Sequence, residues 1–287
     1  MLIEQAFYAL PETLVGSGYA KQEYEASIVS AFSMALLGEL NGRNVANPMS
    51  CIRAERKFMS NYGNLRADLN VKLSGVLTGS KALSQMGFRF DNWIEAKFFR
   101  GKVASTQNLG QVAADLVRLA GLVPLEPGSD QKLPHGRYLL HAHLGDPLVF
   151  LAPRRKGRDA PDRQWVQPLL APGRQSIASL ELDNESQTFN KFLGPGLKTC
   201  LVKLDLTNFV AAPPPTTNQP FYTLVLTRLD AGSIEFGGRK FEFRDDRSFL
   251  VHPEGEYEQL RRSVADALKP DKSDVPTAAE ELEVPEV

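Results

Sequence analysis

The sequence predicts an α/β protein, because segments with the pattern of helices and segments with the pattern of strands occur in the same chain. Two long segments carry apolar residues at helical spacing, whereas several short segments are rich in alternating, β-branched or aromatic residues. The composition is that of an ordinary globular protein, with 43% hydrophobic and 23% charged residues. A chain of 287 residues fits one elaborated domain or a domain with a smaller second lobe. The net charge of −1 argues neither for nor against a polyanionic partner.

The two segments with helical spacing are residues 23–40 and 106–122. In the first, apolar side chains recur every four residues, at Tyr24, Ile28, Phe32, Leu36 and Leu40. In the second, they recur every three or four residues, at Leu109, Val112, Leu116 and Leu119. Gly121 is typical of a helix end. We therefore expect two helices here, and residues 254–268 are a candidate for a last one.

Two segments between these helices have the composition of strands. Residues 65–73 alternate apolar and polar side chains, which is typical of a half-buried strand. Residues 88–99 are rich in aromatic side chains, and Asp91-Asn92 is expected to turn the chain just before the strand. Further strands are predicted in three segments, residues 137–150, 199–205 and 222–229.

Composition divides the chain into four parts. Residues 1–152 hold the predicted core, and residues 153–174 are rich in Pro, Arg and Lys, so we expect a basic surface excursion there. Residues 175–268 should form a β-rich C-terminal part, in the same domain or in a second lobe. Residues 269–287 are acidic, interrupted by proline and poor in aromatic residues, which predicts a disordered acidic tail.

One group of residues points to chemistry. Glu95 and Lys97 alternate on an aromatic strand, so their side chains share one face, where burial costs free energy unless each charge is paired or bound to metal. If the strand that carries Asp68 lies antiparallel beside it, both carboxylates can bind one hard cation such as Mg²⁺. Such an ion polarises a phosphate and activates a bound water, which Lys97 can orient or help to deprotonate. This pattern predicts a phosphodiester-cleaving centre.

The order of helix, Asp68 strand, Glu95-Ala96-Lys97 strand and helix resembles the PD-(D/E)xK nuclease superfamily over roughly residues 20–150. The resemblance implies a restriction-endonuclease-like core. In that core a helix, a meander of three strands, a second helix and a further strand build a mixed central sheet flanked by helices. A β-rich C-terminal extension follows here. Ala67 stands where the family's pattern has proline.

The resemblance also implies roles for residues of the centre. Asp68 and Glu95 would bind Mg²⁺ or Mn²⁺, and Lys97 would be the catalytic lysine. Glu25 on the first helix matches a position that supplies an additional metal ligand in many members. Gln107 or Gln111 on the second helix lies where some members carry a polar residue near the metal.

A second candidate site is the basic excursion. Arg154, Arg155 and Lys156 could contact phosphates of nucleic acid, and Trp165 could stack on a base. Because acidic residues interrupt this run, an ordinary solvated loop explains it equally well.

The other candidate residues also have ordinary interpretations. Glu95 and Lys97 could form a surface pair on an edge strand, and Glu25 could be an exposed residue in the first turn of a helix. His141 and His143 alternate on a predicted strand and could share a face as metal ligands. No third ligand accompanies them at a telling spacing, so a structural histidine pair is favoured.

The sequence thus predicts a metal-dependent endonuclease that hydrolyses DNA, alone or as a homodimer. The alternative is a non-catalytic protein that keeps the nuclease fold as a scaffold and engages a protein partner. No basic leader with an apolar core and no apolar run of about 18 residues is found, so we expect a cytoplasmic protein without a membrane partner. Cys51 and Cys200 are far apart and predict buried structural thiols.

Overall fold

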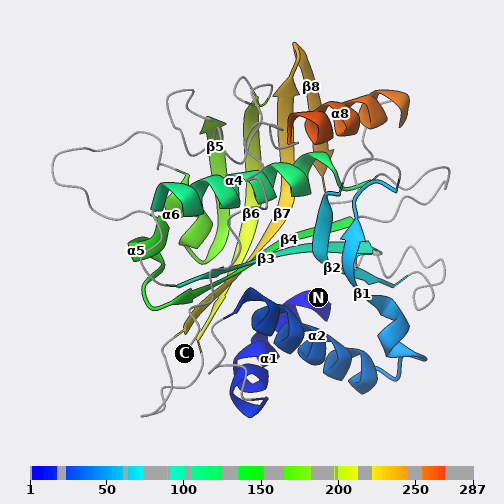
Figure 1. The fold of residues 1–287 in the computed structure, drawn as a ribbon, viewed down its shortest axis with the longest axis vertical. Coiled ribbons are helices and arrows are strands. Elements are labelled where there is room, and N and C mark those ends of the chain that lie inside the picture. Colours follow the sequence, from blue (N-terminus) through cyan, green and yellow to red (C-terminus); the bar gives the residue numbers. More distant parts are fainter. Residues whose placement is uncertain are drawn as a thin grey trace, which may run out of the picture.

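The fold is a mixed α/β arrangement around one open sheet (Figure 1). The computed structural model describes residues 2–17, 24–60, 64–73, 89, 91–100, 105–124, 135–151, 165–181, 197, 200–212, 222–244 and 254–268. The described helices are α1 (Leu2–Gly16), α2 (Glu25–Gly42), the short 3-10 helix η2 (Pro48–Cys51), α4 (Ser105–Gly121), α5 (Pro147–Leu151), α6 (Val166–Leu170) and α8 (Glu254–Ala267). The described strands are β1 (Ile52–Lys57), β2 (Arg66–Lys72), β3 (Asp91–Phe99), β4 (His135–Leu144), β5 (Gly173–Glu181), β6 (Leu201–Ala211), β7 (Tyr222–Phe236) and β8 (Arg239–Arg244).

Strands from both halves of the chain join in this sheet. The described part of the chain forms an eight-stranded sheet: seven strands follow the order β1-β2-β3-β4-β7-β6-β5, and the eighth, β8, pairs with β7 outside this path. The pairing is antiparallel except between β3 and β4, which are parallel and are connected through α4. The first half of β7 pairs with β4, and its second half pairs with β8. The predicted α/β class is therefore confirmed.

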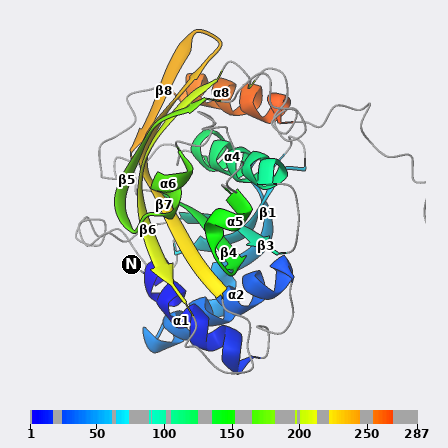
Figure 2. The same ribbon diagram turned by 90° about the vertical axis from the view of Figure 1, so that its left-hand side faces the viewer.

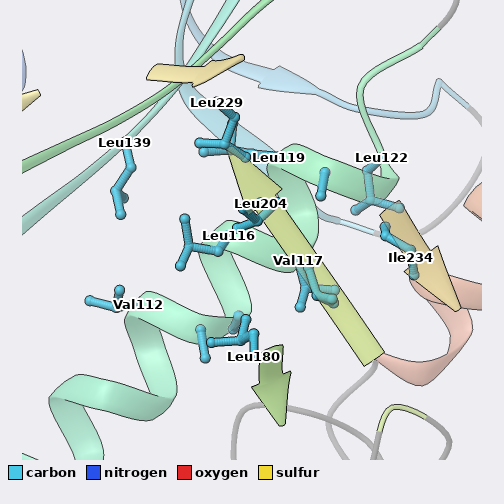
Figure 3. Packing of buried hydrophobic residues seen from close by; sticks show 14 of the residues in the cluster. Val112, Leu116, Val117, Leu119, Leu122, Leu139, Leu180, Leu204, Leu229 and Ile234 are labelled. Carbon is cyan, nitrogen blue, oxygen red and sulfur yellow. The ribbon is translucent and has the colours of Figure 1, made fainter. Parts of the chain in front are cut away.

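Apolar side chains pack against the two faces of the sheet in two clusters. Helices α4, α5, α6 and α8 cover one face, and α1 and α2 cover the other (Figures 1 and 2). On the first face, the apolar stripe of α4 gathers with Leu204, Leu229 and Ile234 of the sheet (Figure 3). Burial of each such side chain stabilises the fold by about 1.5–3 kcal/mol. The stripe that predicted this helix is thus its core-facing side.

Most predicted elements are present. The helices expected over residues 23–40, 106–122 and 254–268 correspond to α2, α4 and α8, and the five expected strands correspond to β2, β3, β4, β6 and β7. The strand expected over residues 137–150 ends at Leu144, and α5 begins at Pro147, where the Asp146 carboxylate accepts a hydrogen bond from the Leu148 N–H. Cys51 and Cys200 are buried free thiols, as expected.

Two predictions about local structure were wrong. Asp91-Asn92 does not turn the chain but begins β3, because the Asn70 side chain donates to the Asp91 carboxylate at 2.6 Å and holds it beside β2. The surface excursion does not extend to residue 174, because α6 and the start of β5 lie within its second half. Residues 152–164 and the expected tail, residues 269–287, lie outside the described residues.

Gly136 at the start of β4 gives a first test of this packing. A Cβ atom at this position would lie 2.4 Å from Asn92 Oδ1 and 2.6 Å from a ring carbon of Tyr138. We expect Gly136→Ala to lower the free energy of unfolding by about 1–3 kcal/mol, because overpacking displaces its neighbours. Gly38→Ala is the matched control, since a Cβ at Gly38 in α2 meets nothing within 4 Å. Urea unfolding of both variants measures the difference, and equal stability of the two would contradict this account.

Candidate active site

The pairing of β2 with β3 brings Asp68 and Glu95 together. Leu69 lies opposite Ile94 in the antiparallel register, so the next position along each strand places Asp68 opposite Glu95. Side chains of directly opposite residues lie on the same face of a sheet. The carboxylate of Asp68 is fixed by the backbone N–H of Ala96, which donates to its Oδ2 at 2.6 Å. The antiparallel arrangement that the site requires is therefore present.

Lys97 connects three elements of the fold. Its Nζ lies 3.4 Å from Asp115 Oδ2 on α4 and 3.7 Å from Glu25 Oε1 at the start of α2. It also donates a hydrogen bond to the carbonyl oxygen of Ala96 at 2.9 Å. Both carboxylates belong to helices that pack on the sheet, Asp115 to α4 and Glu25 to α2. The surface-pair interpretation of Lys97 does not hold, because its side chain is only 16% exposed.

Asp115 belongs to this group and was not predicted. It lies three residues after Val112 and four before Leu119, on the apolar stripe of α4, and its side chain is 1% exposed. Arg118, one turn later, donates to Asp115 Oδ1 at 2.8 Å. A carboxylate on the buried stripe of a helix is a signal that the sequence does carry. Gln107 and Gln111, the residues expected near the centre, are half-buried on the same helix, two turns and one turn before Asp115.

We call Glu25, Asp68, Glu95, Lys97 and Asp115 the acidic cluster. Glu95 is 2% exposed, and its Oε1 has no hydrogen-bond partner among the described residues. Burial raises the pKa of the Glu95 carboxyl well above its ordinary value, and the charges of Asp115 and Asp68 raise it further. Burial also raises the pKa of Asp115 and of Glu25. The carboxyl groups of the cluster therefore resist carrying their full charge together.

The pKa of Lys97 moves in the direction that keeps it charged. Burial by itself lowers the pKa of this ammonium group, but the carboxylates of Asp115, Glu25 and Asp68 outweigh burial and raise it above its ordinary value. Lys97 is consequently protonated at neutral pH while these carboxylates surround it. In this state it is a fixed positive charge and a hydrogen-bond donor.

The charge balance of the acidic cluster fits a divalent cation. When all four carboxylates are ionised, Lys97 and Arg118 are the cations that form ion pairs with them among the described residues, which leaves a formal excess of two negative charges. Glu95 Oε1, which has no hydrogen-bond partner among the described residues, and Asp115 Oδ2, which forms the ion pair with Lys97, are oxygen donors of the kind that Mg²⁺ and Mn²⁺ prefer. Within the described part of the chain, no three Asp, Glu, His or Cys side chains already converge as ligands of one ion.

The predicted nucleic-acid contacts have a different outcome. Arg154, Arg155 and Lys156 lie outside the described residues. Trp165 is 3% exposed and packs in the cluster beneath α4, so the structure argues against the interpretation that its indole stacks on a base. Trp165 is therefore a residue of the apolar core.

His141 and His143 form a buried pair on β4, beside the Lys97 strand. His141 Nδ1 lies 2.9 Å from His143 Nε2, and the His143 ring stacks on Phe99 with ring centroids 4.8 Å apart. Burial lowers the pKa of His141 to about 3 and that of His143 well below its ordinary value, so both rings are neutral at neutral pH. On its other side His141 Nε2 lies 3.4 Å from Thr227 Oγ1. These contacts agree with the structural interpretation of the pair.

The geometry thus establishes two buried carboxylates, Glu95 and Asp115, and two partly exposed ones, Asp68 and Glu25, around Lys97 of a mixed sheet. None of the described helices is long and apolar enough to cross a membrane. Comparison of the chain with protein-family models, with curated proteins and with solved structures found no match.

Proposed function

We propose that the protein is a metal-dependent endonuclease of the PD-(D/E)xK type that hydrolyses phosphodiester bonds of DNA. The observation that carries the proposal is the convergence of Asp68, Glu95 and Lys97 on one face of β2 and β3. The order of elements supports it. Helix α2, the β1-β2-β3 meander, α4 and the parallel strand β4 follow one another as the resemblance to a restriction-endonuclease-like core implies.

The residues of the acidic cluster divide the work. Asp68 and Glu95 would hold Mg²⁺ or Mn²⁺, with Asp115 and Glu25 close enough to Lys97 to complete the negative surroundings. A bound divalent ion supplies Lewis acidity toward the phosphate and lowers the pKa of a bound water. The Ala96 N–H orients the Asp68 carboxylate, which limits the rearrangement needed on binding.

Lys97 supplies positive charge where the reaction develops negative charge. Its ammonium group is protonated in the metal-free protein, so it can donate a hydrogen bond to the attacking water or to a phosphate oxygen. Neutralisation of the neighbouring carboxylates by a cation would weaken the interactions that raise its pKa. Lys97 could therefore transfer a proton only when a metal ion is bound, whereas it can stabilise negative charge with or without the metal.

Calorimetric titration with Mn²⁺ tests the proposed metal site directly. We expect wild type to bind Mn²⁺ and Asp68→Asn to lose at least about tenfold in affinity, since loss of a carboxylate ligand removes charge and donor strength. Asparagine retains an acceptor for the Ala96 N–H, so the fold should persist. Asp205→Asn is the matched control, because the exposed Asp205 also accepts a side-chain hydrogen bond, from Ser176 at 2.6 Å.

The same titration should depend on pH. Because burial raises the pKa of Glu95, a cation must displace a proton from the cluster, and Mn²⁺ affinity should increase by up to about tenfold per pH unit toward pH 8. Titrations in two buffers with different ionisation enthalpies would detect the released proton. Affinity that is independent of pH would contradict the protonated state of the cluster.

A non-catalytic scaffold is the competing function, and one observation favours it. Lys97 already pairs with two carboxylates, so the acidic cluster could be a self-contained structural group. That function predicts no Mn²⁺ binding by wild type and no cleavage of plasmid DNA in Mg²⁺ or Mn²⁺. Binding together with cleavage that EDTA stops would exclude it.

A further inference from the structure

A basic groove lies next to the acidic cluster. It has a volume of about 780 Å³ and is formed where the end of β1, the chain after α4 and helix α8 meet. Its lining includes the cationic side chains of Arg56, Lys57, Arg261 and Arg262, and one acidic side chain, that of Glu258. We call these residues, with Trp93 beneath them, the basic groove.

The basic groove is held together by Arg261. Its guanidinium donates to the carbonyl oxygen of Leu122 at 2.9 Å and to that of Phe58 at 2.5 Å. A third hydrogen bond, at 2.7 Å, goes to Glu258 on the same helix. These contacts join α8 to the ends of α4 and β1, which are far apart in the sequence. The groove is therefore a built feature of the fold.

Two aromatic rings and an arginine form one wall of the groove. Phe58 stacks on Trp93 with ring centroids 5.1 Å apart, and the Arg56 guanidinium lies 4.8 Å from the centroid of the Trp93 ring. Asp91 forms an ion pair with Arg56 at 3.5 Å, which fixes the guanidinium in place. Arg56 thus presents its charge from a stable position.

Lys57 and Arg262 are the exposed cations of the lining. Lys57 is exposed, and no ion pair holds it within the described part of the chain. Arg262 is 64% exposed and shares the Glu258 carboxylate with Arg261 at the longer distance of 3.7 Å. The lining carries a formal charge of +3, from four cations and one carboxylate, although the whole chain carries −1. Such a concentration of positive charge suits a polyanion.

The position of the groove relates it to the acidic cluster. Trp93 precedes Glu95 by two residues on β3, so both side chains point to the same face, about 7 Å apart along the strand. One face of β3 therefore leads from a positively charged groove to a negatively charged cluster. A phosphodiester chain needs this combination, because its phosphates bind to cations while a metal ion binds beside the scissile bond.

We infer that the basic groove binds the phosphate backbone of DNA on one side of the bond that the acidic cluster cleaves. This inference rests on the proposed nuclease function and adds the path of the substrate. Lys57 and Arg262 contact phosphates, and Arg56 and Arg261 support the groove from below. The contacts are made to the backbone, so they contribute affinity without sequence preference.

Fluorescence anisotropy with a short fluorescein-labelled DNA duplex in EDTA, where metal-dependent cleavage cannot proceed, tests the groove. We expect Lys57→Glu/Arg262→Glu to bind at least about tenfold more weakly than wild type, and the slope of log affinity against log salt to fall by about 2. The matched control is Arg174→Glu/Lys203→Glu, on exposed positions of β5 and β6 toward the opposite edge of the sheet. Lys57→Glu alone replaces the double variant if the latter fails to fold.

The outcomes separate the groove from the nuclease centre. Three outcomes would each contradict DNA binding by the basic groove. These are unchanged binding by the double variant, equal weakening by the control, and no binding by wild type. Loss of binding in the double variant alone would support it, whatever the metal titration shows. Conversely, wild type could bind DNA through the groove but neither bind Mn²⁺ nor cleave DNA. This result would support DNA binding by the groove and exclude the proposed nuclease function.

Discussion

Glu95→Gln should abolish metal-dependent DNA cleavage and, at the same time, make the metal-free protein more stable. The expected loss of activity is at least about 10³-fold, because the substitution removes a metal ligand from the centre of the reaction. The expected gain in the free energy of unfolding is about 1–3 kcal/mol at pH 8, since glutamine is nearly isosteric and no longer has to bury a charge near Asp68 and Asp115. Plasmid cleavage and urea unfolding in EDTA measure the two effects.

The pH dependence of this gain follows from the direction of the shift. The pKa of Glu95 in the folded protein lies above its value of 4.5 in the unfolded chain, so the folded state holds the proton more tightly between these two values. Wild type therefore loses stability as pH rises through the folded pKa, and the advantage of Glu95→Gln should be small near pH 4 and largest at pH 8. Mn²⁺ should reverse the order, because it stabilises only a protein that binds it.

Glu12→Gln serves as the control for these measurements. Glu12 lies on the exposed side of α1 and should affect neither cleavage nor stability by more than about 0.5 kcal/mol. Cleavage by Glu95→Gln at the wild-type rate would exclude Glu95 from the chemistry. A metal-free variant less stable than wild type would show that Glu95 is a structural residue.

Glu4→Gln should destabilise the protein by about 3–5 kcal/mol, because it breaks a buried ion cluster from one side. Glu4 Oε1 accepts hydrogen bonds from Arg228 at 2.9 Å and from Tyr138 at 3.1 Å, and Arg89 lies 3.7 Å away. The substitution removes a carboxylate that lies beside the buried Arg89 and one of two carboxylates that pair with Arg228, the other being Asp230 at 2.6 Å. Urea unfolding at pH 7 measures the loss, and Glu12→Gln on the same helix should leave the midpoint unchanged.

Acid should remove the same stabilisation. Burial alone raises the pKa of Glu4, but the surrounding positive charge, including that of Arg89, and the hydrogen bond from Arg228 hold it at about 2, below the ordinary value of 4.5. The contribution of about 3 kcal/mol is present above pH 4.5 and is lost as pH falls through 2. The difference in stability between wild type and Glu4→Gln should therefore shrink over this range. A difference that stays constant would show that packing, and not charge, makes Glu4 important.

The centre of the candidate site could be predicted from the sequence because alternation on a strand fixes which side chains share a face. Glu95 and Lys97 therefore had to lie together, and the apolar residues around them indicated burial. Asp115 was not predicted although its signal is present. The prediction of α4 used the leucines and valines of the apolar stripe and did not consider the carboxylate among them. The partners of Lys97 depend on how two helices pack on the sheet, which local patterns do not specify.

Two elements of the fold were missed for different reasons. Helix α1 carries a clear apolar stripe, with Leu2, Ala6 and Leu10 buried, but Pro11 within it is a residue that usually ends helices. Strand β1 has the polar sequence IRAERK, with no alternation to indicate a strand, and it forms because β2 offers a free edge on which it pairs. In the first case a local rule was too strict, and in the second the tertiary structure decided.

The contact between Glu4 and Arg228 has a consequence for synthesis of the chain on the ribosome. The two residues are 224 positions apart, so at about 5–20 residues per second roughly 10–45 seconds pass between their emergence. During this time Glu4 cannot pair with Arg228, and the edge of β4 that pairs with β7 in the folded protein is still open. The nascent chain thus exposes a strand edge that can pair with other chains, so expression should favour conditions that shield nascent chains from one another.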